Sequence, residues 1–63
     1  MDKLYTVKEA AEILGVSVDF MRELIWSNSI DYINVNTGGK YIYARFTRKH
    51  IEDFLRKCEV KAG

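Results

Sequence analysis

Three cationic side chains are the residues of this chain best suited to recognising a charged partner. Arg22 carries a planar guanidinium, which can donate two parallel hydrogen bonds to the O6 and N7 atoms of a guanine base. Lys40 and Arg45 can hold phosphate groups or enter the minor groove of a duplex, where a flexible cation needs no exact geometry. Basic residues of this kind are often only part of a solvated surface, so they support contact with a nucleic acid only in company with a motif that positions them.

The segment around Arg22 supplies the other candidates for contact with DNA. Ser17, Val18 and Asp19 precede it, and Trp26 follows it by four residues. A serine can cap a helix and also contact a phosphate, and an acidic side chain can read cytosine N4 or orient a neighbouring arginine. Arg22 has an alternative interpretation as a helix-surface residue paired with Asp19 or Trp26 at helical spacing.

Two short helices joined by a turn of about three residues are predicted to position Arg22. Thr6 and Glu9 have the spacing of a capping box, so the first helix should begin near Val7. Gly15 can end it in the left-handed conformation, and Ser17 can cap a second helix that stops near Ser27. The residues expected to face the core are Val7, Ala10, Ala11 and Leu14, then Met21, Leu24 and Ile25, with Phe20 at the border. Those expected to face outward on the second helix are Val18, Asp19, Arg22, Glu23 and Trp26.

A hairpin and a third helix are predicted to follow. Residues 32–35 and 41–46 are rich in aromatic and β-branched side chains and alternate as strands do, and residues 36–40 can supply the positive φ angles of a hairpin loop. Thr47 should cap a last helix with Ile51, Phe54 and Leu55 turned inward. Tyr41 and Tyr43 share one strand face and are expected to pack across the hairpin, with stacking on a nucleic-acid sugar as the alternative. The fold class is therefore mainly α with a small β-hairpin, in the order α-α-β-β-α.

Residues 4–55 resemble the small excisionase-type and MerR-like DNA-binding domains. Such domains typically start like hTxxEAAxhLGVSxxThxxLI, in which h is apolar, and residues 5–25 here read YTVKEAAEILGVSVDFMRELI. Their closing segment typically reads like GRRRIxxSDLExFL, which is echoed by Gly39, Lys40, Ile42, Thr47, Ile51, Glu52, Phe54 and Leu55. The usual arginine cluster is thinned to Lys40 and Arg45. The resemblance implies a winged helix-turn-helix that binds double-stranded DNA.

The resemblance also implies a role in a mobile element. In excisionases, several copies bind adjacent sites, bend the DNA and favour an integrase complex that excises, so a recombinase partner and self-association on DNA are expected. The alternative within this class is a MerR-like transcriptional regulator without an effector domain. An alternative of another class is a protein–protein interaction module that kept the winged fold.

The distribution of charge and the position of Trp26 separate these classes. The net charge is only +1, but residues 40–50 hold Lys40, Arg45 and further cations with no acid. Asp19 and Glu23 place two carboxylates on the helix that should approach DNA, which predicts modest, salt-sensitive affinity. We expect one of two positions for Trp26. It closes the edge of the core against Tyr32 or the final helix, or else it is exposed and takes part in a protein–protein contact. A buried Trp26 and a positive strip from Arg22 to Lys40 would favour DNA binding.

Length and composition restrict the remaining possibilities. The 63 residues have room for one domain, expected to span 1–63, with the helix-turn-helix at about 6–27, the wing at 32–46, the last helix at 48–58 and a frayed tail at 59–63. A membrane span and a signal peptide are not expected, and the single Cys58, expected half-buried, fits a reducing cytoplasm. The sole histidine, His50, has no nucleophile nearby, so we expect no catalytic residue, metal, cofactor or small-molecule substrate.

Overall fold

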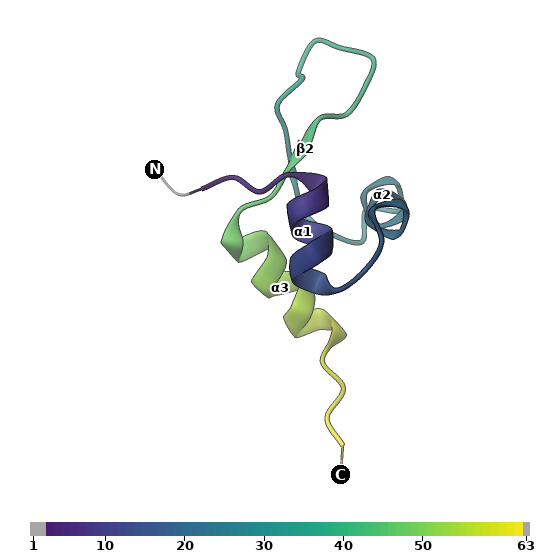
Figure 1. Ribbon diagram of the computed structural model, residues 1–63, viewed down its shortest axis with the longest axis vertical. Coiled ribbons are helices and arrows are strands. Elements are labelled where there is room, and N and C mark those ends of the chain that lie inside the picture. Colours follow the sequence, from purple (N-terminus) through teal and green to yellow (C-terminus); the bar gives the residue numbers. More distant parts are fainter. Residues whose placement is uncertain (1–2, 63) are drawn as a thin grey trace.

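The chain forms three short helices and a two-stranded antiparallel hairpin (Figure 1). The computed structural model describes residues 3–62. Its elements are α1 (Val7–Leu14), α2 (Val18–Trp26), β1 (Ile33–Asn34), β2 (Ala44–Arg45) and α3 (Arg48–Cys58). This arrangement confirms the predicted winged helix-turn-helix fold. Residues 59–62 of the expected tail are exposed and follow the last helix, while residues 1, 2 and 63 of the expected domain lie outside the described residues.

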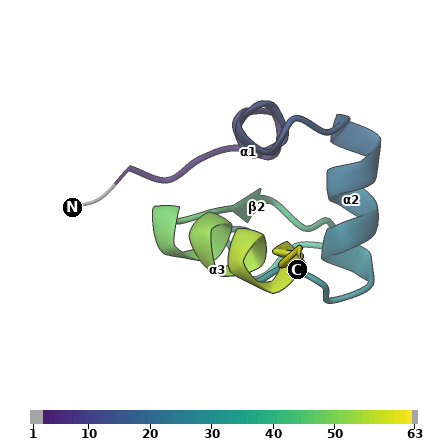
Figure 2. The ribbon, with the colours of Figure 1, turned by 90° about the horizontal axis from the view of Figure 1, so that it is seen from below.

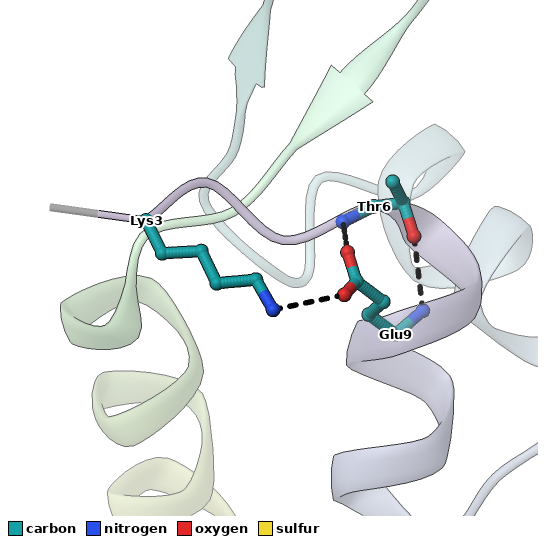
Figure 3. A network of polar contacts seen from close by, with 3 residues as sticks. All are labelled: Lys3, Thr6 and Glu9. Carbon is teal, nitrogen blue, oxygen red and sulfur yellow. Dashed lines mark hydrogen bonds and ion pairs between the residues drawn. The ribbon is translucent and has the colours of Figure 1, made fainter.

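A reciprocal capping box starts α1 at the predicted residue. The Thr6 hydroxyl accepts a hydrogen bond from the Glu9 backbone N–H at 3.1 Å, and the Glu9 carboxylate accepts one from the Thr6 N–H at 3.0 Å (Figure 3). Lys3 adds an ion pair, with its Nζ 3.1 Å from Glu9 Oε2. The Thr6 backbone hydrogen bond and then the Lys3 ammonium hold the pKa of Glu9 below its ordinary value, because both stabilise the charged carboxylate.

The turn between α1 and α2 has the predicted chemistry. Gly15 adopts a left-handed conformation with φ 71° and ψ 31°, which a residue with a Cβ reaches only with strain. The Ser17 hydroxyl then accepts a hydrogen bond from the Phe20 N–H at 3.1 Å and caps α2. At the other end of α2, Ser27 is the capping residue and Asn28 takes a positive φ of 56°, which asparagine tolerates better than most residues. The predicted stop near Ser27 is confirmed.

The core is small and takes side chains from all three helices, from β2 and from the segments that follow α2 and β2. Its buried members are Ala10, Ala11, Met21, Ile25, Ile30, Ala44, Phe46 and Ile51. Figure 2 shows α2 running across one end of α1 and α3, which contact each other, and Figure 1 shows β2 near the start of α1, at the base of the wing. Met21 and Phe46 are the largest fully buried side chains, so α2 and the segment after β2 supply most of the bulk at the centre.

Three predicted exposures are wrong. Val18, expected to face outward, is half-buried against the core, because the tight turn holds the first residue of α2 close to it. Leu55, expected to face inward, is exposed at a shallow depression between α1 and α3, next to the exposed Ile13. Cys58, expected half-buried, is exposed at the end of α3. The core of so short a chain does not reach the last turn of α3.

Residues 33–45, which we call the wing, pair over a shorter length than the sequence predicted. Ile33 pairs with Arg45 and Asn34 with Ala44, and the Val35 N–H donates to the Tyr43 carbonyl at 3.0 Å. The expected strands at 32–35 and 41–46 are therefore too long. The loop between them projects away from the helices (Figure 1).

Asparagine side chains shape the loop of the wing in place of a longer strand ladder. The Asn34 side-chain oxygen accepts from the backbone N–H groups of Asn36, at 3.0 Å, and Tyr43, at 3.1 Å. The Asn36 side-chain amide donates to the Tyr41 carbonyl at 2.9 Å. The prediction of positive φ angles at 36–40 is wrong, because within residues 3–62 only Gly15 and Asn28 have them.

Tyr5 and Phe46 form a further backbone pair that the sequence did not reveal. The Tyr5 N–H donates to the Phe46 carbonyl at 2.8 Å, and the Phe46 N–H donates to the Tyr5 carbonyl at 2.9 Å. This pair ties the start of the chain to the end of β2. It therefore holds the base of the wing against α1 and positions the wing relative to the helices.

Candidate nucleic-acid interface

A groove between α2 and the wing brings the predicted cations together. It has a volume of about 460 Å³. Arg22, Trp26, Lys40, Tyr41, Tyr43 and Arg45 line it with charged and aromatic groups, and Val7, Ile25, Ile42 and Ala44 add apolar surface. We call it the α2–wing groove. Residues of α2 and residues of the wing, which are well separated in the sequence, thus share one concave surface, because the hairpin returns beside α2.

Arg22 projects from the exposed face of α2. Its nearest charged partner is Asp19, with Arg22 Nη1 3.5 Å from Asp19 Oδ1. The side chains are 59% and 91% exposed, respectively, so water screens the pair and its free energy is within about 0–1 kcal/mol. The alternative interpretation of Arg22 as a partner of Asp19 is therefore realised, but the ion pair is weak enough for a stronger acceptor to displace it.

Lys40, in the loop of the wing, and Arg45, on β2, both line the groove. Lys40 is exposed, and none of the ion pairs within residues 3–62 includes it. Arg45 is half-buried, and its Nη1 donates to the Ala44 carbonyl at 2.9 Å. That hydrogen bond fixes part of the guanidinium and leaves its other N–H groups available to an anion.

The three residues at the start of α2 differ in what they can contact. The Ser17 hydroxyl oxygen is engaged in capping and retains its own hydrogen for a further acceptor. Asp19 is highly exposed, whereas Val18 is half-buried against the core and offers little surface. None of the three lines the α2–wing groove. The structure therefore brings Arg22, Trp26, Lys40 and Arg45 together, and places Ser17, Val18 and Asp19 outside that group.

Trp26 does not close the core. It is 71% exposed at the last residue of α2, so the interpretation that it packs against Tyr32 or the final helix is wrong. Met21 and Ile25 already fill the buried face of α2, and Trp26 follows Arg22 by one helical turn on the exposed face. Of the two features expected to accompany DNA binding, the gathering of Arg22 and Lys40 is present and the burial of Trp26 is not.

Two tyrosines of the groove were not among the predicted site residues. Tyr41 is 73% exposed and Tyr43 is 55% exposed, and both line the α2–wing groove. They were expected to pack across the hairpin, but the pairing is too short to cover them. The alternation of Lys40, Tyr41, Tyr43 and Arg45 along one segment was the available signal, since basic residues interleaved with aromatic ones are typical of nucleic-acid surfaces.

The remaining chemistry-bearing residues have structural roles or stand alone. His50 caps α3, because its Nδ1 accepts from the Thr47 N–H at 3.1 Å and its own N–H donates to the Thr47 hydroxyl at 3.1 Å. Within the described part of the chain, no group of three or more His, Cys, Asp or Glu is arranged to hold a metal ion. None of the helices in residues 3–62 has the length and apolar character that a bilayer crossing requires.

Comparison with known proteins identifies one family. The family described as a helix-turn-helix domain matches residues 4–59. The match thus covers the turn between α1 and α2, the wing and the whole of α3. Searches of curated proteins and of solved structures gave no match.

Proposed function

Because the chain belongs to the helix-turn-helix domain family and is a small DNA-binding protein, we propose that it recognises a specific sequence of double-stranded DNA. In this proposal α2 enters the major groove and the wing contacts the neighbouring phosphate backbone. The observation that carries the proposal is the α2–wing groove, because it places Arg22 of α2 beside Lys40 and Arg45 of the wing.

The dimensions of α2 suit this mode of binding. The diameter of an α-helix with its side chains, about 10–12 Å, fits the ~12 Å width of the major groove. Arg22 would leave its weak pair with Asp19 and donate two hydrogen bonds to a guanine, a contact that discriminates against the wrong base by ~1–3 kcal/mol. Lys40 and Arg45 would bind phosphates, which fixes the register of α2 without reading sequence.

The biological role we propose is that of an excisionase, or recombination directionality factor, of a mobile element. The support is the resemblance of both ends of the domain to excisionase-type sequences. Copies of the protein would bind adjacent sites, bend the DNA and assist an integrase. A MerR-like transcriptional regulator without an effector domain is the alternative that the same residues allow. Either role is one of binding without catalysis, and we place it in the cytoplasm, where the exposed thiol of Cys58 stays reduced.

The test of sequence-specific binding compares two variants by fluorescence anisotropy with labelled duplexes. Arg22→Ala should weaken binding to the preferred sequence by about 10-fold or more and leave binding to random DNA nearly unchanged. Lys40→Ala should weaken both about equally. Lys49→Ala, which removes an exposed lysine of α3 outside the groove, is the control for the change in net charge. Equal losses from Arg22→Ala and Lys40→Ala on both duplexes would remove Arg22 as a base-reading residue.

The excisionase role needs a separate experiment. Duplexes carrying an element end at different positions along the fragment would reveal bending through their gel mobility, and an added integrase would reveal a joint complex. Bending together with a complex that forms only when both proteins are present would support the excisionase role. Specific binding without either property would favour the transcriptional regulator.

The exposure of Trp26 favours one further candidate, a protein-interaction module that kept the winged fold. A large exposed aromatic side chain beside arginine is a common anchor of protein interfaces. The absence of any duplex binding at low salt, together with unimpaired folding, would move this candidate to first place.

A further inference from the structure

We propose that the α2–wing groove also binds single-stranded DNA, with an unpaired base stacked on the indole of Trp26. This goes beyond the recognition of duplex DNA and does not depend on it. A base inside a duplex is already stacked on its neighbours, so its face is not available to a side chain. An exposed aromatic ring can stack only on a base whose face is free, and the unpaired bases of single-stranded DNA have free faces.

The first support is the aromatic surface of the groove. Trp26 and Tyr41 are 71% and 73% exposed, and Tyr43 is also largely exposed. These rings contribute little to the core, in which Met21 and Phe46 are the largest fully buried side chains. Three large rings from two separate elements therefore surround one groove without stabilising the fold. Such rings are stacking platforms for successive bases, and stacking tolerates any base because each has a π face.

The second support is the charge of the groove. Arg22, Lys40 and Arg45 line it, and within residues 3–62 no carboxylate does so. The acidic neighbours Asp19 and Glu23 lie on α2 outside the lining. A lining with cations and no acid is complementary to a polyanion. Cations that follow a phosphate backbone beside aromatic rings that accept bases are the two components of single-strand binding sites.

The third support is that the wing holds its tyrosines in place at the backbone. The Asn36 side chain donates to the Tyr41 carbonyl at 2.9 Å, and the Tyr43 N–H donates to the Asn34 side-chain oxygen at 3.1 Å. These hydrogen bonds fix the backbone at both tyrosines before any ligand binds. A groove organised in advance loses less conformational entropy when it takes up a flexible single strand.

The experiment uses the fluorescence of Trp26, which is the only tryptophan of the chain and so reports on this site alone. The whole 63-residue protein is titrated with a thymidine oligonucleotide of about 10 nucleotides at about 50 mM salt, a length within the range covered by small single-strand binding folds. An abasic oligonucleotide of the same length and charge is the matched ligand. We expect the thymidine strand to quench Trp26 and to bind more tightly than the abasic strand. Equal binding of the two strands would overturn the proposal, because charge alone would then account for it.

Three variants test the role of the ring, with affinities measured by anisotropy of a labelled thymidine strand. Trp26→Leu should weaken binding roughly 5- to 150-fold, the loss expected for one stacked base, while Trp26→Phe should restore most of the affinity. Phe20→Leu removes an exposed aromatic ring of α2 that lies outside the groove and should have no effect. Circular dichroism of each variant confirms folding. An unchanged affinity of Trp26→Leu would overturn the proposal.

The experiments can refute the proposed single-strand binding and the proposed duplex recognition independently of each other. Trp26→Leu should lower the affinity for the thymidine strand several-fold more than the affinity for duplex DNA, because only the single strand offers a free base to the ring, whereas Arg22→Ala should mainly weaken specific duplex binding. Quenching by the single strand without any duplex binding would refute the proposed duplex recognition alone. Equal losses of single-strand and duplex affinity in Trp26→Leu would overturn base stacking, because Trp26 would then contact the sugar-phosphate backbone common to both.

Discussion

Replacing Lys40 with alanine should reduce the salt dependence of duplex binding, and the size of the reduction reports how many phosphate contacts are lost. Each phosphate that a protein cation neutralises releases condensed counterions, so the logarithm of the binding constant falls with the logarithm of salt concentration by ~0.9 per contact. In the arrangement proposed here Lys40 and Arg45 contact phosphates, while Arg22 reads a base. Two contacts predict a slope of about −1.8.

The slope converts directly into a loss of affinity. Between about 50 and 200 mM salt, a slope of about −1.8 lowers the binding constant roughly 12-fold. Lys40→Ala leaves one contact, with a slope of about −0.9 and a loss of roughly 3.5-fold over the same range. Lys40 is exposed and takes part in none of the ion pairs found in residues 3–62, so its removal should leave the stability of the fold nearly unchanged.

The assay is an anisotropy titration of a labelled duplex at four or more salt concentrations, with the slope fitted for each variant. Lys49→Ala controls for the loss of one positive charge from the whole protein, since this residue lies on α3 and not in the α2–wing groove. A slope that is the same for Lys40→Ala and the unmodified protein would refute the assignment of Lys40 to a phosphate. An equal change of slope in Lys49→Ala would show that net charge, rather than the groove, controls the salt dependence.

Three further predictions concern the fold that carries the groove. Thr6→Ala removes the capping oxygen of α1 and should lower the free energy of unfolding by ~1 kcal/mol in urea titrations, while Thr6→Ser should retain it. Glu9→Gln tests the lowered pKa of Glu9: the carboxylate stabilises the fold above its ordinary pKa of 4.5, and this contribution disappears as pH falls through the lower folded-state value. The stabilities of Glu9→Gln and the unmodified protein should therefore differ above pH 4.5 and converge in acid; a constant difference would contradict the linkage. Gly39→Ala should weaken DNA binding more than it lowers the melting temperature, because a Cβ there would meet the Asn36 side chain that holds the loop. Gly38→Ala, with open space around its new Cβ, should bind DNA normally.

The local signals in the sequence predicted the helix-turn-helix well, because short-range hydrogen bonds determine its ends. Thr6, Gly15, Ser17 and Thr47 each act within four residues of their own position, and each occupies the cap that its type and spacing indicated. The one unexpected partner is His50, which takes the place of the usual acidic residue in the box that starts α3. A neutral imidazole nitrogen can accept the same backbone hydrogen bond as a carboxylate, so the position tolerates it.

The candidate site was only partly predictable, because it depends on contacts between distant segments. The cations Arg22, Lys40 and Arg45 were identified by residue type, but their common groove arises from the way the wing returns beside α2. Helical periodicity correctly predicted that Trp26 faces outward from α2, but it could not predict whether another element covers the ring. Whether such a residue is covered depends on a neighbouring element, and in this fold the wing leaves it open.

The groups that hold the fold together and those that line the groove are largely different, and this separation has a physical origin. The buried residues of α2 are Met21 and Ile25, whereas Arg22 and Trp26 project from its exposed face. A core this small has little stability to spare, and charged or aromatic side chains that face water can change without creating a cavity in it. Losses of affinity caused by substitutions at the exposed positions can therefore be attributed to the interface itself. Ile25 and Ala44 are the exceptions, because they line the groove and are also buried in the core.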